Sequence, residues 1–227
     1  MRRKGQKGGK MRHIVIGLLI GLGVALSGYV QAEDSADLPS FKTGDSWTYA
    51  RVDKNDGSRT GKFVITVTSV SDNGYATATK VIEGTADDEV GEYTKEMNDI
   101  KNDDRKFTPF VPYFSFPLTP GKTWEGSWKF TARGGKKNNM LNFDATMKSR
   151  VEGWETVTTP AGEFKALKIV FKSKFTDQHS GRGKATTGIR WYSPEVRHVV
   201  RSEIKDVGGG KKSRDEVTEL VSFNPAP

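Results

Sequence analysis

Alternation of apolar and polar residues is the dominant pattern along this chain, and it predicts β-strands. Between residues 143 and 151 almost every odd position is apolar and almost every even position is polar. Residues 165–175 repeat the pattern, with apolar side chains on one face and lysines on the other. Because successive side chains of a strand point to opposite faces, each segment has one face for a core and one for water. Further strands are predicted at residues 63–68, 75–82, 187–191, 198–207 and 217–223, whereas 89–100 fits a strand or a helix.

Glycine-containing turns separate these segments. Asn55-Asp56-Gly57, Asp72-Asn73-Gly74, Arg133-Gly134-Gly135 and Gly208-Gly209-Gly210 supply residues that tolerate positive φ. Strands joined by such turns form an antiparallel meander. We therefore predict an all-β fold, a curved antiparallel sheet or incomplete β-barrel of about nine or ten strands after an N-terminal signal helix.

A single domain is expected over residues 33–227, with a faint internal repeat. Gly44-Asp45-Ser46-Trp47 resembles Gly121-Lys122-Thr123-Trp124, and two meander halves at 33–106 and 117–227 would account for this. Residues 107–120, which separate the halves, hold four prolines and five aromatics. Proline interrupts helices and central strands, so we interpret the segment as a crossover packed over one end of the core. The alternative is a lid or rim over an apolar ligand cavity.

The N-terminus has the three parts of a secretory signal. Residues 1–12 carry six lysines and arginines, residues 14–26 carry no charge, and Ala32 provides a small side chain at the end. We predict a signal peptide over residues 1–32, cleaved between Ala32 and Glu33, and a periplasmic mature protein. Release outside the cell and a retained N-terminal anchor are the alternatives, and either Met1 or Met11 fits as the start. An apolar run this short is below the roughly 20 residues of a membrane helix.

Most of the net charge of +8 comes from the N-terminal residues. Six of these charges precede residue 33, after which 30 basic and 28 acidic residues are nearly balanced. A nucleic-acid surface needs a concentrated basic face, so we expect no nucleic-acid partner. The chain has no cysteine, which excludes a disulfide scaffold, a thiol nucleophile and a cysteine-ligated metal.

Candidates for catalysis are few. After removal of the signal only His179 and His198 remain as histidines, and neither stands in a nucleophile motif. The acidic stretch over residues 87–104 is interpreted as a solvated edge, with weak cation binding as the alternative. We therefore expect no enzyme, no cofactor and no metal site, although a carboxylate pair that meets only in space is left open.

Aromatic side chains are the strongest candidates for a ligand site. The tryptophans lie in or beside predicted strands, where a concave aromatic face would hold an acyl chain or another apolar ligand. The alternative is that they fill an ordinary core. The candidate ligand-lining residues are Trp47, Phe114, Phe116, Trp124, Trp128 and Trp191.

Three segments carry a resemblance to a known group. They run from Pro117 to Trp124, from Val157 to Ile169 and from Trp191 to Arg201. In this order they resemble uncharacterised exported proteins of Gram-negative bacteria. That group is distantly similar to the periplasmic lipoprotein-carrier and lipoprotein-receptor half-barrel fold. The resemblance implies an apolar concave side. It also implies a soluble, carrier-like role, because the lipid-attachment cysteine of the receptors is missing.

These observations favour an exported, non-enzymatic binding module for an apolar or amphiphilic component of the cell envelope. Its expected partner is a lipid or another apolar ligand, and no membrane span is expected after cleavage. An interaction or scaffold protein of the envelope is the first alternative. A hydrolase acting on envelope polymers is the second.

Overall fold

The computed structural model describes residues 35–57, 60–103, 105–134, 139–208 and 213–226. The predicted signal peptide and its cleavage site at Ala32 and Glu33 lie outside the described residues.

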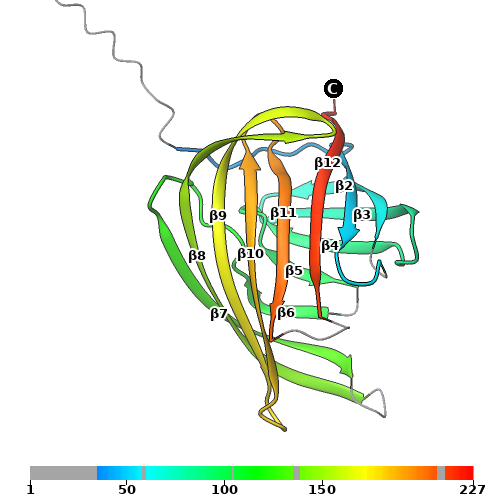
Figure 1. The fold of residues 1–227 in the computed structure, drawn as a ribbon, viewed down its shortest axis with the longest axis vertical. Helices are drawn as coiled ribbons and strands as arrows, with labels where there is room; N and C mark the ends of the chain where they lie inside the picture. The colour runs from blue at the N-terminus through cyan, green and yellow to red at the C-terminus, as the bar shows by residue number, and fades with distance from the viewer. Residues whose placement is uncertain (1–34, 58–59, 104, 135–138, 209–212, 227) are drawn as a thin grey trace, which may run out of the picture. The chain divides into compact units, whose positions relative to one another are not determined.

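Twelve antiparallel strands form one closed barrel (Figure 1). The strands are β1 (Ser46–Asp53), β2 (Gly61–Ser71), β3 (Gly74–Glu83), β4 (Glu89–Thr94), β5 (Asp99–Asn102), β6 (Arg105–Val111), β7 (Thr123–Gly134), β8 (Asn139–Thr159), β9 (Gly162–Asp177), β10 (Gly183–Ser193), β11 (His198–Val207) and β12 (Asp215–Asn224). Each strand pairs with the next along the chain, and β1 also pairs with β12. The meander therefore returns to its start and leaves no free sheet edge in the barrel.

The all-β prediction is confirmed, and the alternation behind it is visible in β8. Ala145, Met147, Ser149 and Val151 are buried, while the even positions between them are exposed. The structure differs from expectation in closing completely and in having two more short strands, β5 and β6. These two strands lie where acidic residues and prolines mask the alternation. Pro109 lies within β6, whose ladder to β7 consists of Phe107 with Phe130 and Thr108 with Lys129.

One end of the barrel is filled by a hydrophobic core. Residues 35–45 cross this end, drawn in blue in Figure 1, and the crossover from Pro112 to Lys122 packs beside them. Ala36 and Leu118 join the two segments by a β-bridge, with backbone hydrogen bonds of 2.8 Å in both directions. Phe114 and Leu118 are buried in the core. The interpretation of the proline-rich segment as a crossover over one end of the core is thus confirmed for its second half.

Polar contacts hold this plug in place. Asn98, which is buried, donates to the carbonyl oxygen of Phe114 at 3.1 Å and accepts from its amide at 2.8 Å. The carboxylate of Asp45 accepts from Arg197 Nη2 at 2.9 Å and from the amides of Lys42 and Ala226 at 2.8 Å each. Burial opposes the charge on Asp45, but these donors outweigh it and lower its pKa below the ordinary value.

Replacing Asn98 tests whether the plug depends on this side-chain clamp. Asn98→Ala leaves two buried backbone groups of Phe114 unpaired, each at about 1–3 kcal/mol, so we expect the free energy of unfolding to fall by about 2–6 kcal/mol. Urea denaturation followed by tryptophan fluorescence measures it. The exposed Asn142→Ala is the matched control and should change the midpoint little. Equal midpoints for the two variants would show that the clamp is dispensable.

Candidate functional site

The opposite end of the barrel contains a cavity of about 210 Å³. It lies near the hairpins β7–β8, β9–β10 and β11–β12, at the lower end in Figure 1, and the short strands β5 and β6 close its other side. A second, smaller core cluster surrounds it, formed by residues of β6 to β9. The filled end and this cavity thus belong to the two opposite ends of one barrel.

Aromatic rings form one wall of the cavity. Trp128 and Phe130 of β7 lie two positions apart and therefore face inward together, and Phe171 and Phe175 of β9, four positions apart, do the same. Phe130 contacts Phe175 edge to face, with ring centroids 6.0 Å apart. Trp128 pairs across the sheet with the small Ala145 of β8, which takes up little of the interior. The register of three strands thus produces an apolar surface that faces open space.

A single arginine of β10 faces this wall. Arg190 Cζ lies 4.0 Å from the centroid of the Phe171 ring and 4.3 Å from that of Tyr113. Gly188, two positions earlier on the same face, makes the arrangement possible, because a Cβ there would lie 2.5 Å from Phe171 Cζ. Cation–π contacts of this kind stabilise a guanidinium that has left bulk water.

Arg190 has no anionic partner among the described residues. Its Nη1 is buried without a hydrogen-bond partner, and no described carboxylate lies within ion-pair distance. Asp99 of β5, itself buried, contributes negative charge that favours the charged form of Arg190. Burial raises the pKa of Asp99 to about 7, against the opposing effect of Arg190. Near neutral pH the carboxyl group is therefore only partly ionised.

A second cavity of about 200 Å³ lies beside β1 to β4 and also holds an arginine. Arg51 Cζ lies 4.9 Å from the centroid of the Phe63 ring, and its buried Nε has no hydrogen-bond partner in the described structure. Two interior arginines of this barrel therefore contact aromatic faces and keep donors unused. Burying such a donor lowers the stability of the folded protein unless a hydrogen-bond acceptor pairs with it.

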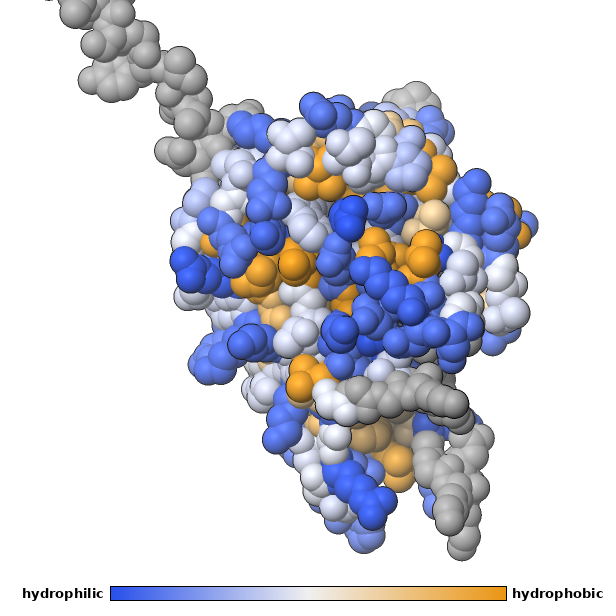
Figure 2. All heavy atoms as spheres, viewed as in Figure 1, coloured by the Kyte–Doolittle hydropathy of each residue, from blue (hydrophilic) through white to orange (hydrophobic). Residues whose placement is uncertain are grey.

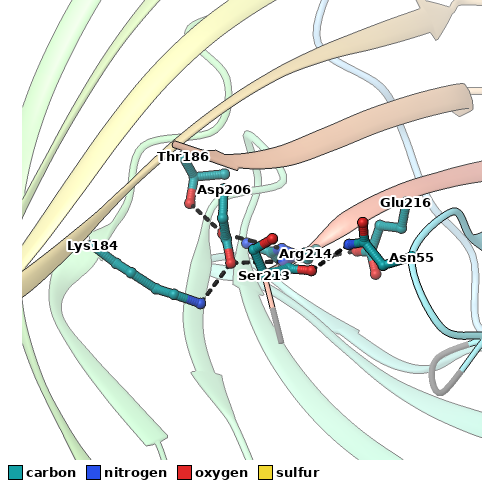
Figure 3. A network of polar contacts seen from close by, with 7 residues as sticks. All are labelled: Asn55, Lys184, Thr186, Asp206, Ser213, Arg214 and Glu216. Carbon is teal, nitrogen blue, oxygen red and sulfur yellow. Dashed lines mark hydrogen bonds and ion pairs between the residues drawn. The ribbon is translucent and has the colours of Figure 1, made fainter. Parts of the chain in front are cut away.

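A polar network fixes the rim of the first cavity (Figure 3). Asp206 of β11 accepts from Thr186 Oγ1 at 3.1 Å and from the Arg214 amide at 2.8 Å, and it pairs with Lys184. Arg214 Nη1 also lies 3.8 Å from Glu216 Oε1. Burial works against ionisation of Asp206, but the Arg214 amide and the Lys184 ammonium outweigh it and lower its pKa. The rim therefore holds cations in defined positions at the edge of an aromatic wall.

The predicted ligand-lining residues divide between the two ends. Trp47 and Phe114 are buried in the core that fills the plugged end, and Phe116 packs against that core. Trp191 is also buried, but it lies on the face of β10 opposite to Arg190, where its Nε1 donates to Glu155 at 2.9 Å. Trp124 is half-buried and donates its Nε1 hydrogen to the carbonyl oxygen of Pro112 at 3.0 Å. Trp128 lines the cavity. Their role toward a ligand stays a prediction.

Sequence reasoning missed the polar side of the site. Arg190, Asp99 and Tyr113 were not among the candidates, because charged and phenolic side chains in strands are normally solvated. An arginine within an otherwise apolar stretch, Ile189-Arg190-Trp191, is the signal that was present in the sequence. Only the strand register shows whether this arginine faces the interior of the barrel or the solvent.

The histidines take no part in the cavity. Tyr49 Oη lies 2.7 Å from His198 Nδ1 and donates to the carbonyl oxygen of Val199 at 2.6 Å. Burial lowers the pKa of His198 to about 4, so the ring is neutral at physiological pH. His179 lies in the exposed β9–β10 turn, where its amide donates to Asp177.

Clusters of metal ligands and membrane-spanning helices are both absent from the described part of the chain. No group of three or more histidine, aspartate or glutamate side chains is placed to hold a metal ion. No helix in this part of the chain has the length and apolarity needed to cross a membrane.

Comparisons with known proteins give a family match over residues 111–217, to the DUF3108-like family. The three segments that carry the resemblance to exported proteins of Gram-negative bacteria lie inside this range. No curated protein matches.

The chain is similar to solved structures from Bacteroides fragilis, Parabacteroides distasonis and Escherichia coli. A Bacteroides fragilis protein described as exported, with a YmcC-like fold, has a TM-score of 0.49 and 19% identity, covering 83% of this chain and 99% of its own. A Parabacteroides distasonis protein described as a lipoprotein has a TM-score of 0.48 and 17% identity, with 84% and 100% covered. The hypothetical lipoprotein YmcC of Escherichia coli has a TM-score of 0.43 and 11% identity, with 81% and 85% covered.

The buried carboxyl group of Asp99 predicts a pH dependence of stability. Its pKa of about 7 exceeds the ordinary 3.8, so between these values the native state keeps a proton that the unfolded state loses. Stability from this group is therefore present at pH 4 and falls as the pH rises through 7. Asp99→Asn should be more stable than the wild type at pH 8, by at most about 4 kcal/mol at about 1.36 kcal/mol per pKa unit.

Urea unfolding at pH 4.5 and pH 8 measures this difference, with the exposed Asp37→Asn as the control. The gain from Asp99→Asn should shrink toward acid pH, while the control stays flat. A gain that is the same at both pH values would contradict a buried, proton-holding Asp99.

Proposed function

We propose that this protein is an exported, non-enzymatic binding protein that holds part of an amphiphilic ligand in the open end of its barrel. The observation that carries this function is the juxtaposition of an aromatic wall and unpaired or rim-held cations around one cavity. Ligand sites commonly combine a mostly apolar lining with a few fixed polar groups. In Figure 2, apolar side chains reach the surface toward the lower end of the molecule, the end at which the cavity lies.

The size of the cavity limits what is bound. At about 30 Å³ for each water in the liquid, a volume of 210 Å³ corresponds to roughly seven waters. Sites that enclose a whole drug-sized ligand are usually larger, at about 300–1,000 Å³. The ligand is therefore a small single-chain amphiphile, or it inserts one end and leaves the rest outside. A two-chain lipid does not fit inside as a whole.

The placement of the reactive side chains supports binding rather than catalysis. His198 is neutral and is engaged by Tyr49 in the plugged end, away from the cavity residues. Catalysis by a general base requires that base within hydrogen-bond reach of the reacting group. The basic, apolar and small-residue pattern of the first 32 residues supports export, with the periplasm as the proposed location.

Filling the cavity tests the proposal. Ser173 of β9 lies between Phe171 and Phe175 on the inner face and lines the cavity. Ser173→Phe should weaken binding of the neutral dye N-phenyl-1-naphthylamine by about tenfold or more, because the added ring takes the space of the ligand. Titration of the dye fluorescence measures it, and circular dichroism checks the fold.

Lys172→Met, which alters the neighbouring exposed side chain, is the matched control and should leave dye binding within about twofold. Ser173→Leu serves if the phenylalanine variant does not fold. Dye binding that is absent in the wild type, or unchanged in both cavity-filling variants, would contradict the proposed function.

A further inference from the structure

Arg190 is positioned to recognise a charge on the ligand. It comes from the middle of β10, paired on one side with Ile169 of β9 and on the other with Ser202 of β11. Both neighbouring strands thus place it within the barrel wall, with its side chain over Phe171 and Tyr113. It is only partly exposed, and the space it meets is the cavity.

The contacts of the guanidinium leave its edge available. Two aromatic rings contact the group, at 4.0 Å and 4.3 Å from Cζ to the ring centroids. Rings attract the positive charge but accept little from N–H groups in the guanidinium plane, which has five donors in a fork. The buried Nη1 has no partner among the described residues. An acceptor supplied from the cavity would complete this arrangement.

The charged groups around Arg190 do not replace such an acceptor. Asp99 is the one carboxyl group that favours its charge, and Arg214 acts against it. With a pKa of about 7, Asp99 is partly protonated near neutral pH. At the rim, Asp206 is already engaged by Thr186 and by the Arg214 amide. Positive charge is thus left without full compensation inside an aromatic cavity.

We propose that Arg190 binds the anionic group of the ligand, a carboxylate or a phosphate, through the free edge of its guanidinium while the aromatic wall holds the attached apolar portion. The inference rests on the proposed function and adds the charge of the ligand to it. A guanidinium fork matches both kinds of anion, because each presents two oxygens in one plane. At the rim, Lys184 and Arg214 are already paired with Asp206, so the anion is assigned to Arg190.

Two dyes that differ in one sulfonate separate charge from hydrophobic binding. 1-Anilinonaphthalene-8-sulfonate carries the anion, and N-phenyl-1-naphthylamine lacks it. Arg190→Met should weaken binding of the sulfonate dye by about tenfold or more and change binding of the neutral dye by less than about threefold, since charge-assisted pairs are lost only for the first. Arg150→Met, on the exposed face of β8, removes the same charge outside the cavity and should change neither.

Competition with the wild-type protein identifies the kind of anion and needs no variant. Octanoate or octyl phosphate should displace the neutral dye at concentrations about tenfold below those of octanol, which has the same chain without the charge. The anion that displaces the dye at the lower concentration identifies the headgroup chemistry.

The outcomes distinguish the two proposals. If neither dye binds, the proposed function itself fails. If the neutral dye binds while octanol competes as well as both anions, the binding function stands and the role of Arg190 is overturned. Equal loss of both dyes in Arg190→Met, with retained circular dichroism, would likewise assign Arg190 to packing.

Discussion

The width of a twelve-strand barrel is the constraint on which the rest of this structure depends. The diameter of a barrel grows with the number of strands, and about eight strands enclose an interior that side chains alone can fill. Twelve strands leave more space than the inward-facing residues occupy, so additional chain or an additional molecule must fill it. In this protein, residues 35–45 and the crossover from Pro112 to Lys122 fill one end. The other end has no such filling among the described residues and contains the cavity.

Buried polar groups are paired at some positions of the barrel and unpaired at others. At the plugged end Asn98 clamps Phe114 and donors surround Asp45, although Trp154 Nε1, beside the same core, is buried without a hydrogen-bond partner among the described residues. At the cavity end Arg190 and Arg51 keep unpaired nitrogens beside aromatic rings. Buried polar groups are normally satisfied, and unsatisfied ones concentrate where a protein has a task beyond folding. What distinguishes Arg190 is that its unpaired nitrogen belongs to a cationic side chain that lines the cavity, and for that reason we propose the binding site there.

The fold was predictable from sequence because period-two alternation survives in the long strands. Residues 143–151 and 165–175 mark the wall formed by β8 and β9, and glycine-containing turns mark the hairpins. The short strands β5 and β6 were not predicted. The four residues of β5 show too little alternation, and Pro109 interrupts the alternation in β6.

The site was predictable only in part. Aromatic residues could be identified as candidates from sequence, but whether a tryptophan fills a plug or lines a cavity depends on which end of a strand it occupies. Trp47 belongs to the plug, Trp128 belongs to the cavity wall, and Trp191 is buried on the face of β10 opposite to Arg190. The inward position of Arg190 could not be predicted from the sequence for a similar reason. The apolar neighbours Ile189 and Trp191 suggest that the arginine faces water, and the pairing of β9 with β10 places it inside instead.

Fluorine NMR of protein labelled with 5-fluorotryptophan tests the central claim most directly, because the five tryptophans sample both ends of the barrel. Resonances are assigned by single Trp→Phe substitutions, and octanoate is titrated into the wild-type protein. We predict that the resonance of Trp128 shifts on titration while that of Trp47 stays in place. A shift of Trp47 with Trp128 unmoved would place the ligand in the plugged end and would contradict binding at the cavity end.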